Sequence, residues 1–306
     1  MRLVFAGTPS VAVPSLEALT VDDHELVAVI TRPDAPLGRK RVLTASPVAA
    51  WANDRAVPTI KANRLDDVVT AEVEALQPDL GVIVAYGGLV REPLLSTPRH
   101  GWINLHFSLL PRWRGAAPVQ HAILAGDSVT GAAVFQLVPA LDAGALFATH
   151  RRDIGPDETA GDLLNALAVE GAELLARVVA DLEAGTAQSV QQIGEPTVAP
   201  KITLEDARVR WEEPAAAVYN RIRAVTPEPG AFTHIDGERF KLLAVRTGPP
   251  ASPLPPGHVA DLDSRILVGT ATVPLELLEV QPAGKRPMPA TDWWRGRPHD
   301  VVTVAA

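Results

Sequence analysis

The chain has 306 residues, of which 47% are hydrophobic, and it carries a formal net charge of -8. This length predicts about two domains, and the hydrophobic content excludes global disorder because it suffices for a sizeable core. The absence of cysteine excludes disulfides, thiolate metal sites and a cysteine nucleophile, and the acidic charge means that any RNA binding would depend on local basic patches.

The start of the chain lacks the pattern of a signal peptide, because Gly7, Thr8 and Pro9 interrupt its first apolar run. No uninterrupted apolar segment has the roughly 20 residues that a membrane-spanning helix needs. The lack of cysteine also fits a reducing compartment. We therefore expect a cytoplasmic protein without membrane contact.

The first half of the chain alternates short apolar strands with helices. The expected strands cover residues 2–7, 25–31, 57–60, 79–85 and 102–107, and the expected helices cover residues 8–19, 46–55, 64–76 and 116–126. Ser46 and Pro47 favour a helix start, because serine caps free backbone N–H groups and proline fits the first turn. Near-continuous apolar strands that alternate with helices indicate a parallel α/β sheet.

Residues 129–154 have a different pattern, with two extended runs on either side of a loop at Pro139–Gly144. The apolar spacing of residues 159–184 then predicts a long amphipathic helix. Residues 189–204 show little periodicity and contain two prolines, which is typical of a linker. We therefore place the end of a first domain at residue 188.

The second expected domain covers residues 205–306 and has shorter elements. A helix is expected at residues 212–224, and the short apolar runs after it are separated by turn signals such as Asp236-Gly237. Such runs indicate a small β-barrel or sandwich. Basic residues gather in two segments of the chain, residues 31–41 and 284–297.

The sequence lacks the common cofactor and metal motifs. The first strand–helix turn, AGTPS, has one glycine where the dinucleotide fingerprint requires three. No P-loop lysine motif occurs, and no pair among the eight histidines has metal-ligand spacing. We therefore predict neither a dinucleotide nor a metal.

Two polar residues interrupt an apolar strand in the segment WINLHF, residues 102–107. Alternate residues of a strand point to the same face, so Asn104 and His106 should lie side by side. They stand at the carboxyl end of a strand in an expected parallel sheet, where α/β folds bind ligands. A structural histidine with an asparagine partner is the competing interpretation.

A carboxylate, Asp142, lies in the loop of a second polar element, QLVPALDAGALF. If this loop folds over the strand end, the carboxylate joins the amide and the imidazole. The three groups suit acyl transfer to an amine. Asn104 can donate to a developing oxyanion, and His106 can stabilise the same oxygen or move protons. Asp142 can orient the imidazole, raise its pKa and keep it protonated more of the time.

A serine hydrolase with Ser108 as nucleophile is the alternative chemistry at this strand end. No G-x-S-x-G elbow occurs in the sequence, and Ser108 is only two residues beyond His106. Its hydroxyl is better suited to anchoring the loop or a ligand. The candidate reaction therefore proceeds by direct attack of an amine, without a covalent nucleophile.

Asn-x-His, followed by Ser-Leu-Leu-Pro and by Leu-Asp-x-Gly downstream, resembles the active-site pattern of the folate-dependent formyltransferases. Other segments are similar to the members of that family that act on methionyl-tRNA: FAGTP at 5–9, RPDAPLGRKR at 32–41, VAYG at 84–87, SLLPRWRGAAP at 108–118 and QPAGKRPM at 281–288. The resemblance therefore extends over nearly the whole chain.

The resemblance implies a Rossmann-like parallel-sheet formyltransferase domain followed by an OB-like β-barrel domain that binds tRNA. It implies transfer of the formyl group of 10-formyltetrahydrofolate to the α-amino group of methionine on initiator methionyl-tRNA, for translation initiation. The folate is then a donor substrate, no metal takes part, and we expect a monomer. Asn104, His106 and Asp142 are carried over as the catalytic residues.

The resemblance also implies three groups of binding residues. The first is a folate-binding segment of four residues, Ser108, Leu109, Leu110 and Pro111. The second lines the folate pocket and consists of Ala85, Tyr86 and Gly87. The third is a basic loop that contacts tRNA, with Arg39 first and Lys40 and Arg41 beside it.

The sequence departs from the family pattern at the loop of Asp142. The family has Gly-Leu-Asp-Thr-Gly-Asp, and this chain has alanine at positions 140, 143 and 145. Hydrogen bonds that shape the loop are therefore expected to be lost at Ala143 and Ala145. Three alternatives stay open on the sequence: a folate-dependent formyltransferase of a small amine, a formyltetrahydrofolate hydrolase, and a non-catalytic RNA-binding protein.

Overall fold

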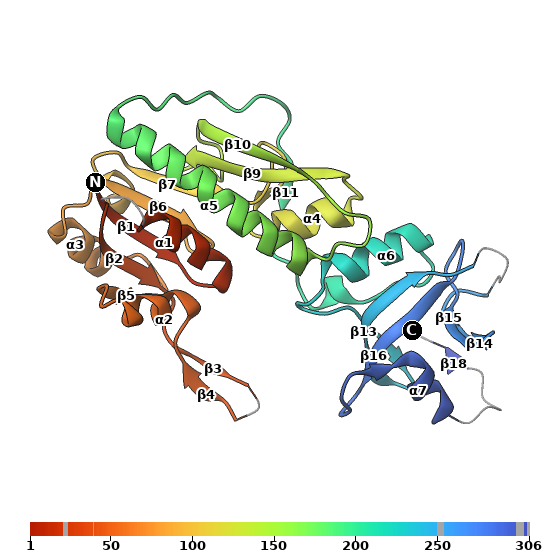
Figure 1. Cartoon of the computed structure of the whole chain (residues 1–306). Coiled ribbons are helices and arrows are strands. Elements are labelled where there is room, and N and C mark those ends of the chain that lie inside the picture. Colours follow the sequence, from red (N-terminus) through yellow and green to blue (C-terminus); the bar gives the residue numbers. More distant parts are fainter. Residues whose placement is uncertain (21–23, 39, 250–253, 298–302, 305–306) are drawn as a thin grey trace. The chain divides into compact units, whose positions relative to one another are not determined.

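The computed structural model describes residues 1–20, 24–38, 40–249, 254–297 and 303–304 (Figure 1). The chain divides into two compact units with interleaved boundaries. The first comprises Met1–Pro118, Val129–Asp153 and Leu164–Ala199, and the second comprises Val119–Ser128, Ile154–Leu163 and the chain from Pro200 onward. The predicted domain limits at residues 188 and 204 remain a prediction.

A mixed sheet forms the centre of the first unit. Within the described residues its strands run in the order β10-β9-β7-β6-β1-β2-β5. Their bounds are β1 (Arg2–Gly7), β2 (Glu25–Thr31), β5 (Thr59–Lys61), β6 (Leu80–Val84), β7 (Trp102–His106), β9 (Val129–Gln136) and β10 (Leu146–Asp153). The predicted parallel α/β sheet is confirmed for β5, β2, β1, β6 and β7.

The two extended runs predicted in residues 129–154 join the same sheet as β9 and β10. Strand β9 lies antiparallel to both β7 and β10. The hairpin geometry follows from the short connection, because only antiparallel neighbours can be joined without a crossover. Gln136, at the end of β9, pairs with Ile103 near the start of β7, so the β9–β10 loop leaves from the amino end of β7. The loop then folds back along that strand and brings Asp142 to His106.

Helices follow the strands largely where the sequence predicts them. The helices of the first unit are α1 (Val13–Leu19), α2 (Pro47–Asp54), α3 (Asp67–Ala75) and most of α5 (Ala160–Ala184), whereas α4 (Pro118–Leu124) belongs to the second unit except for Pro118. A 3-10 turn at Ser10–Ala12 precedes α1, so the first helix begins later than residue 8. Ser46 caps α2 as predicted, because its Oγ accepts a hydrogen bond from the Ala49 N–H at 3.0 Å.

The long helix α5 packs closely on the sheet beside the candidate site. A Cβ added at Gly171 would lie 3.0 Å from Leu105 Cδ1 on β7 and 3.5 Å from Ala132 Cβ on β9. Leu163, Leu167 and Leu175 of the same helix are fully buried. Strand β7 is therefore held from behind, and its polar residues face the opposite side of the strand.

Two small pairings were not predicted from the sequence. Strands β3 (Ala35–Leu37) and β4 (Val42–Thr44) form a hairpin, which extends away from the sheet in Figure 1. The other pairing joins β8 (Arg114–Gly115) in parallel to β11 (Val198–Ala199). The second pairing means that the end of the expected linker is bound to the first unit.

The second unit contains an antiparallel half-barrel, which confirms the predicted OB-like fold. Its described strands are β12 (Phe232–Ile235), β13 (Glu238–Thr247), β14 (His258–Leu262), β15 (Arg265–Val268), β16 (Leu275–Pro282), β17 (Met288–Pro289) and β18 (Thr303–Val304), and its helices are α6 (Ala215–Ala224) and α7 (Ala290–Arg295). Trp211, Trp293 and Leu275 lie in its core. No helix in the described part of the chain is both long enough and apolar enough to cross a membrane.

Candidate active site

The three predicted catalytic side chains converge at the end of β7. Asn104 is half-buried and His106 is 6% exposed, two residues apart on the same strand. Asp142 lies in the β9–β10 loop, and its Oδ2 is 3.9 Å from His106 Nδ1. The amide, the imidazole and the carboxylate therefore gather from two segments that are far apart in the sequence.

The two nitrogens of His106 have different surroundings. Nε2 lies 2.8 Å from the backbone oxygen of Trp113. Because a carbonyl oxygen can only accept a hydrogen bond, Nε2 carries the hydrogen. The ring meets Phe135 edge-on, at 6.4 Å between centroids and 84° between planes. Nδ1 is then the nitrogen that points toward Asp142 and can take up a proton.

The pKa of His106 is lowered below its ordinary value of 6.5, because burial of the ring disfavours the charged form. The nearby carboxylate of Asp142 and the Trp113 carbonyl oxygen act in the opposite direction but do not outweigh burial. The expectation that Asp142 raises the pKa of His106 is confirmed, but the expectation that the ring is kept protonated is wrong, because burial lowers the pKa by more. At neutral pH the imidazole is neutral and able to accept a proton.

Backbone geometry fixes the loop that carries Asp142. The residue adopts a φ of +44°, in the left-handed region that aspartate tolerates better than most residues. Its Oδ2 accepts a hydrogen bond of 2.7 Å from the backbone N–H of Gly115. A Cβ at Gly144 would lie 1.7 Å from the Gln136 oxygen, so only glycine fits there. The loop therefore turns tightly and aims the carboxylate at the 113–115 segment.

One residue that the sequence did not indicate also holds this loop. Gln192, in the expected linker, donates from Nε2 to the backbone oxygens of Asp142 at 2.8 Å and Gly144 at 2.9 Å. Its position in a segment without periodicity gave no signal. The loop that has alanine at positions 143 and 145 is thus held by the side chain of Gln192, which is distant in the sequence.

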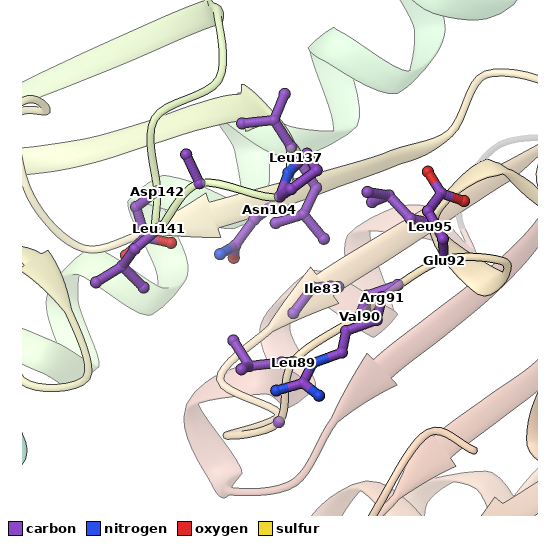
Figure 2. A pocket seen from close by; sticks show the side chains of 14 residues that line it. Ile83, Leu89, Val90, Arg91, Glu92, Leu95, Asn104, Leu137, Leu141 and Asp142 are labelled. Atoms are coloured by element: carbon purple, nitrogen blue, oxygen red, sulfur yellow. The ribbon is translucent and has the colours of Figure 1, made fainter.

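A cavity of about 400 Å³ opens beside Asn104 and Asp142. Its other lining residues come from β6, from the segment after β6 and from the β9–β10 loop: Ile83, Gly88, Leu89, Val90, Arg91, Glu92, Leu95, Leu137, Val138, Pro139, Ala140 and Leu141. Figure 2 shows Asp142 and Leu141 toward one end of the cavity and Glu92 and Leu95 toward the other. The walls are mainly aliphatic, and the polar groups of the site lie at one end.

The Asn104 amide is available to a ligand in this cavity. Among the described residues, its side chain makes no hydrogen bond. Figure 2 places the amide in the open part of the cavity, on the side of Asp142. An uncommitted amide at this position can donate to an oxygen of a bound molecule.

A second cavity of about 510 Å³ shares residues with the first. Gly88, Leu89 and Arg91 line both cavities, and the second also takes in Arg32 and Arg64. Three arginines against one carboxylate, Asp66, in the same lining favour an anionic ligand. The two cavities together could hold a molecule with an apolar part and a charged part.

The residues implied for folate binding fall in different places. Within the described chain, the lining of the first cavity includes none of Ser108–Pro111 and none of Ala85–Gly87, and Gly87 lines the second cavity. Ser108 is fully buried, and its Oγ donates to the Arg112 oxygen at 2.7 Å. Tyr86 is 2% exposed and donates to the Ala62 oxygen at 2.8 Å.

The segment Ser108–Pro111 packs on β9, next to the candidate site. Leu110 packs on Ala133 and Phe135, and a Cβ at Gly131 would lie 2.7 Å from Leu109 Cδ2. Sequence reasoning missed the aliphatic lining at residues 88–95 and 137–141. The apolar spacing there is too irregular to be assigned to an element. A role of Ser108–Pro111 in donor binding remains a prediction.

The basic residues implied for tRNA binding belong to the β3–β4 hairpin. Arg39 lies outside the described residues. Lys40 and Arg41 are exposed at the turn, where the Arg41 N–H donates to the Gly38 oxygen at 3.0 Å. The hairpin also exposes Leu37 by 67%, with Val42 and Leu43 similarly exposed. The segment expected as a flexible loop is therefore a hairpin with a basic turn and apolar strands.

The described residues hold no group of three histidine, aspartate or glutamate side chains that could bind a metal ion.

Two family models match the chain. One, described as "Formyl transferase", matches residues 1–179, and the other, "Formyl transferase, C-terminal domain", matches residues 201–298. A methionyl-tRNA formyltransferase of Clavibacter sepedonicus is 61% identical over 97% of each chain. One of Leifsonia xyli subsp. xyli is 62% identical over 99% of each chain.

Solved structures share the fold at low sequence identity. The sugar 3N-formyl transferase WlaRD is 15% identical with a TM-score of 0.70, over 94% of this chain and 99% of that chain. A methionyl-tRNA formyltransferase from Clostridium thermocellum is 15% identical with a TM-score of 0.58, over 81% of this chain and 94% of that chain. The family models and the full-length relatives together show that the chain belongs to the formyl transferase family and, within it, to the methionyl-tRNA formyltransferases.

Proposed function

We propose that this chain transfers the formyl group of 10-formyltetrahydrofolate to the α-amino group of methionine on initiator tRNA, through Asn104, His106 and Asp142. The observation that carries the residue assignment is the 3.9 Å approach of Asp142 Oδ2 to His106 Nδ1, beside a cavity that Asn104 also lines. A reaction on initiator tRNA implies that the protein works in the cytoplasm. The proposed domain limits are residue 188 for the end of the catalytic domain and residue 204 for the end of the linker.

The geometry supplies what direct amine attack requires. The neutral α-amino nitrogen forms a bond to the formyl carbon, and the carbonyl oxygen gains negative charge. The Asn104 amide donates a hydrogen bond to that oxygen. His106 Nδ1 accepts the proton that the nitrogen loses, and Asp142 stabilises the imidazolium. The bond from the formyl carbon to the donor nitrogen then breaks, and that nitrogen takes up a proton to give tetrahydrofolate.

The first cavity fits the ring system of the donor. Flat heterocycles bind in mainly apolar clefts with a few fixed polar groups, and this cavity has aliphatic walls with the site at one end. The second cavity, with Arg32, Arg64 and Arg91, suits the carboxylates of the donor's glutamate tail. Arg91 lines both cavities and lies where the two parts of the donor meet.

Replacing Arg91 by alanine is expected to raise the KM for the donor by about 10-fold and to leave kcat nearly unchanged, because one carboxylate contact is lost and the reacting atoms are not touched. The measurement is initial velocity against donor concentration at saturating methionyl-tRNA. Arg99→Ala is the matched control, since its side chain is 70% exposed and lies outside both linings. Equal donor KM in the two variants would contradict the assignment of the second cavity.

The β3–β4 hairpin fits a contact with the tRNA. Its turn is basic and its strands expose Leu37, Val42 and Leu43, so it offers cations to phosphates and apolar surface to bases. The net charge of -8 means that this attraction is local. Arg39 is proposed as part of the same contact.

The double variant Lys40→Ala/Arg41→Ala is expected to raise the KM for methionyl-tRNA by about 10-fold and to reduce the dependence of that KM on salt, because phosphate contacts release counterions. The measurement is KM across a potassium chloride series. Arg151→Ala, an exposed position on β10, controls for loss of charge. A double variant that follows the wild-type salt dependence would rule out the hairpin as a phosphate contact.

The decisive experiment mixes the protein with 10-formyltetrahydrofolate and methionyl-tRNA, and compares free methionine, an amino sugar nucleotide and water as acceptors. Formyl-methionyl-tRNA as the main product is the expected outcome. Formylation of the small amine would favour the small-amine alternative, and release of formate without acceptor would favour a hydrolase. Binding of tRNA without any turnover of the donor would favour a non-catalytic RNA-binding protein.

A further inference from the structure

The segment from residue 190 to residue 199 joins the two loops that form the candidate active site. At one side, Val190 and Leu146 exchange backbone hydrogen bonds of 2.8 and 2.9 Å. At the other, Thr197 Oγ1 accepts from the Trp113 N–H at 2.9 Å, and its backbone oxygen accepts from the Arg114 N–H at 2.9 Å. The segment expected as a linker therefore borders the catalytic groups.

Gln192 lies at the middle of this segment and uses its full hydrogen-bonding capacity. Nε2 donates both of its hydrogens, to the backbone oxygens of Asp142 and Gly144. Oε1 accepts from Arg114, at 3.2 Å from Nε and 2.5 Å from Nη2. An amide side chain has two donors and two acceptor lone pairs, so every position is filled. Gln192 thus connects the Asp142 loop directly to the 113–115 segment.

Each of the two loops that Gln192 joins contributes to the contact between Asp142 and His106. The first carries Asp142, and the second supplies the Trp113 oxygen to His106 Nε2 and the Gly115 N–H to Asp142 Oδ2. The Asp142 loop has alanine at positions 143 and 145, whose side chains cannot form hydrogen bonds. Its attachment therefore comes from the Asp142 carboxylate, which accepts the Gly115 N–H, from its backbone oxygens and from residues outside it.

We infer that Gln192 is a positioning residue, which holds the Asp142 carboxylate beside His106 by linking the Asp142 loop to Arg114. The inference rests on the proposed roles of Asp142 and His106. Catalytic groups must be held within fractions of an ångström of the productive geometry, so a loop that moves away lowers turnover even when all reacting groups are present. Gln192 does not touch the reacting atoms.

The first test compares Gln192→Leu with Gln191→Leu, a neighbour that is exposed and makes no hydrogen bond among the described residues. Gln192→Leu is expected to lower kcat by roughly 10- to 100-fold and to change the KM for methionyl-tRNA by less than about threefold, because positioning of the reacting groups is lost. The donor KM is expected to rise as well, since residues 137–142 of the released loop line the donor cavity. Gln191→Leu is expected to match wild type. Equal kcat in the two variants would overturn the inference.

Gln192→Glu is the second variant, and it keeps the size and the acceptors of the side chain. It retains the contact with Arg114 but places a carboxylate against two carbonyl oxygens, so the loop is released while the segment stays anchored. The same fall in kcat is expected, with a thermal unfolding midpoint close to that of wild type. Wild-type kcat in Gln192→Glu would contradict the role of the two donated hydrogen bonds.

A double-mutant cycle with Asp142→Asn separates positioning from general support of the fold. If Gln192 acts through the carboxylate, Gln192→Leu should change kcat by less than about threefold in the Asp142→Asn background. The same fold loss in both backgrounds would overturn the inference, because the effect would then be independent of Asp142. Near-normal turnover of Asp142→Asn alone would overturn the catalytic assignment in the proposed function, and this inference with it.

The pH profile gives a readout that a purely structural role would not move. The Asp142 charge raises the pKa of His106 against the effect of burial. Release of the loop weakens that contribution, so the acid limb of kcat/KM in Gln192→Leu should move to lower pH. An acid limb that stays at the wild-type pH would contradict the inferred link between Gln192 and the Asp142–His106 contact.

Discussion

Replacing His106 by alanine will lower kcat by about 1,000-fold, because the proton acceptor for the attacking amine is removed. His106 does not line the cavity proposed for the donor, so tetrahydrofolate should bind the variant as it binds wild type. The measurements are single-turnover formylation of methionyl-tRNA and, separately, calorimetric binding of tetrahydrofolate. Turnover within about tenfold of wild type would refute the role of His106 as the general base.

The matched control for this variant is His150→Ala. His150 is partly exposed on β10, where its Nε2 lies 2.9 Å from Glu170 Oε2, and it takes no part in the site. It is expected to retain wild-type turnover. A loss in both variants would indicate a general effect of removing a histidine from the first unit and not a catalytic one.

The pH dependence of the wild type follows from the lowered pKa of His106. Activity needs both the neutral α-amino nitrogen of the substrate and the neutral imidazole. The part of the acid limb of kcat/KM that belongs to His106 should therefore lie below pH 6.5, where Nδ1 becomes protonated. The native state binds this proton less readily than the unfolded chain, so folding stability also falls as the pH is lowered from 6.5 toward the native pKa. His106→Ala should lose that part of the stability change, measured by urea unfolding.

Replacing Asp142 by asparagine will lower kcat by about 100-fold, because the imidazolium that forms during the reaction loses its stabilising charge. Asparagine can still accept the Gly115 N–H, which bonds to Oδ2 in the wild type, so the loop should keep its shape. The acid limb of the pH profile should move to lower pH, since the carboxylate raises the pKa of His106. The measurement is kcat/KM from pH 5 to 9.

Asp54→Asn is the control for this variant, since Asp54 is exposed at the end of α2 in the same unit. It should leave both kcat and the pH profile unchanged. If Asp142→Asn behaves in the same way as Asp54→Asn, the carboxylate has no part in the reaction and only the backbone of the loop matters.

Local patterns were sufficient to predict much of the fold and two of the three catalytic neighbours. The two-residue period of a strand placed Asn104 and His106 on one face of β7, and Ser46 marked the start of α2. Strand periodicity and helix capping are properties of consecutive residues, so one sequence reveals them. Asp142 required a further assumption, that its loop folds back over β7.

Features that depend on contacts between distant segments were not predictable in this way. Gln192 lies in a segment without periodicity, and its importance comes from bonds to residues about 50 and about 80 positions away. The net direction of the His106 pKa depends on how completely the ring is buried, which the sequence does not state. The β3–β4 hairpin escaped notice because its apolar residues are exposed and do not mark a buried face.

The hydrogen bond from His106 Nε2 to the Trp113 oxygen also decides which way a proton can travel. That backbone oxygen cannot take up a proton, so Nε2 cannot pass its proton on toward the interior. Proton transfer through the ring from Nδ1 to Nε2 is therefore excluded. Whatever arrives at Nδ1 has to depart from Nδ1, either to the departing folate nitrogen or to solvent at the mouth of the cavity. The imidazole therefore gains and loses its proton at Nδ1 alone. The group that accepts this proton must approach the same nitrogen to which the amine gave it.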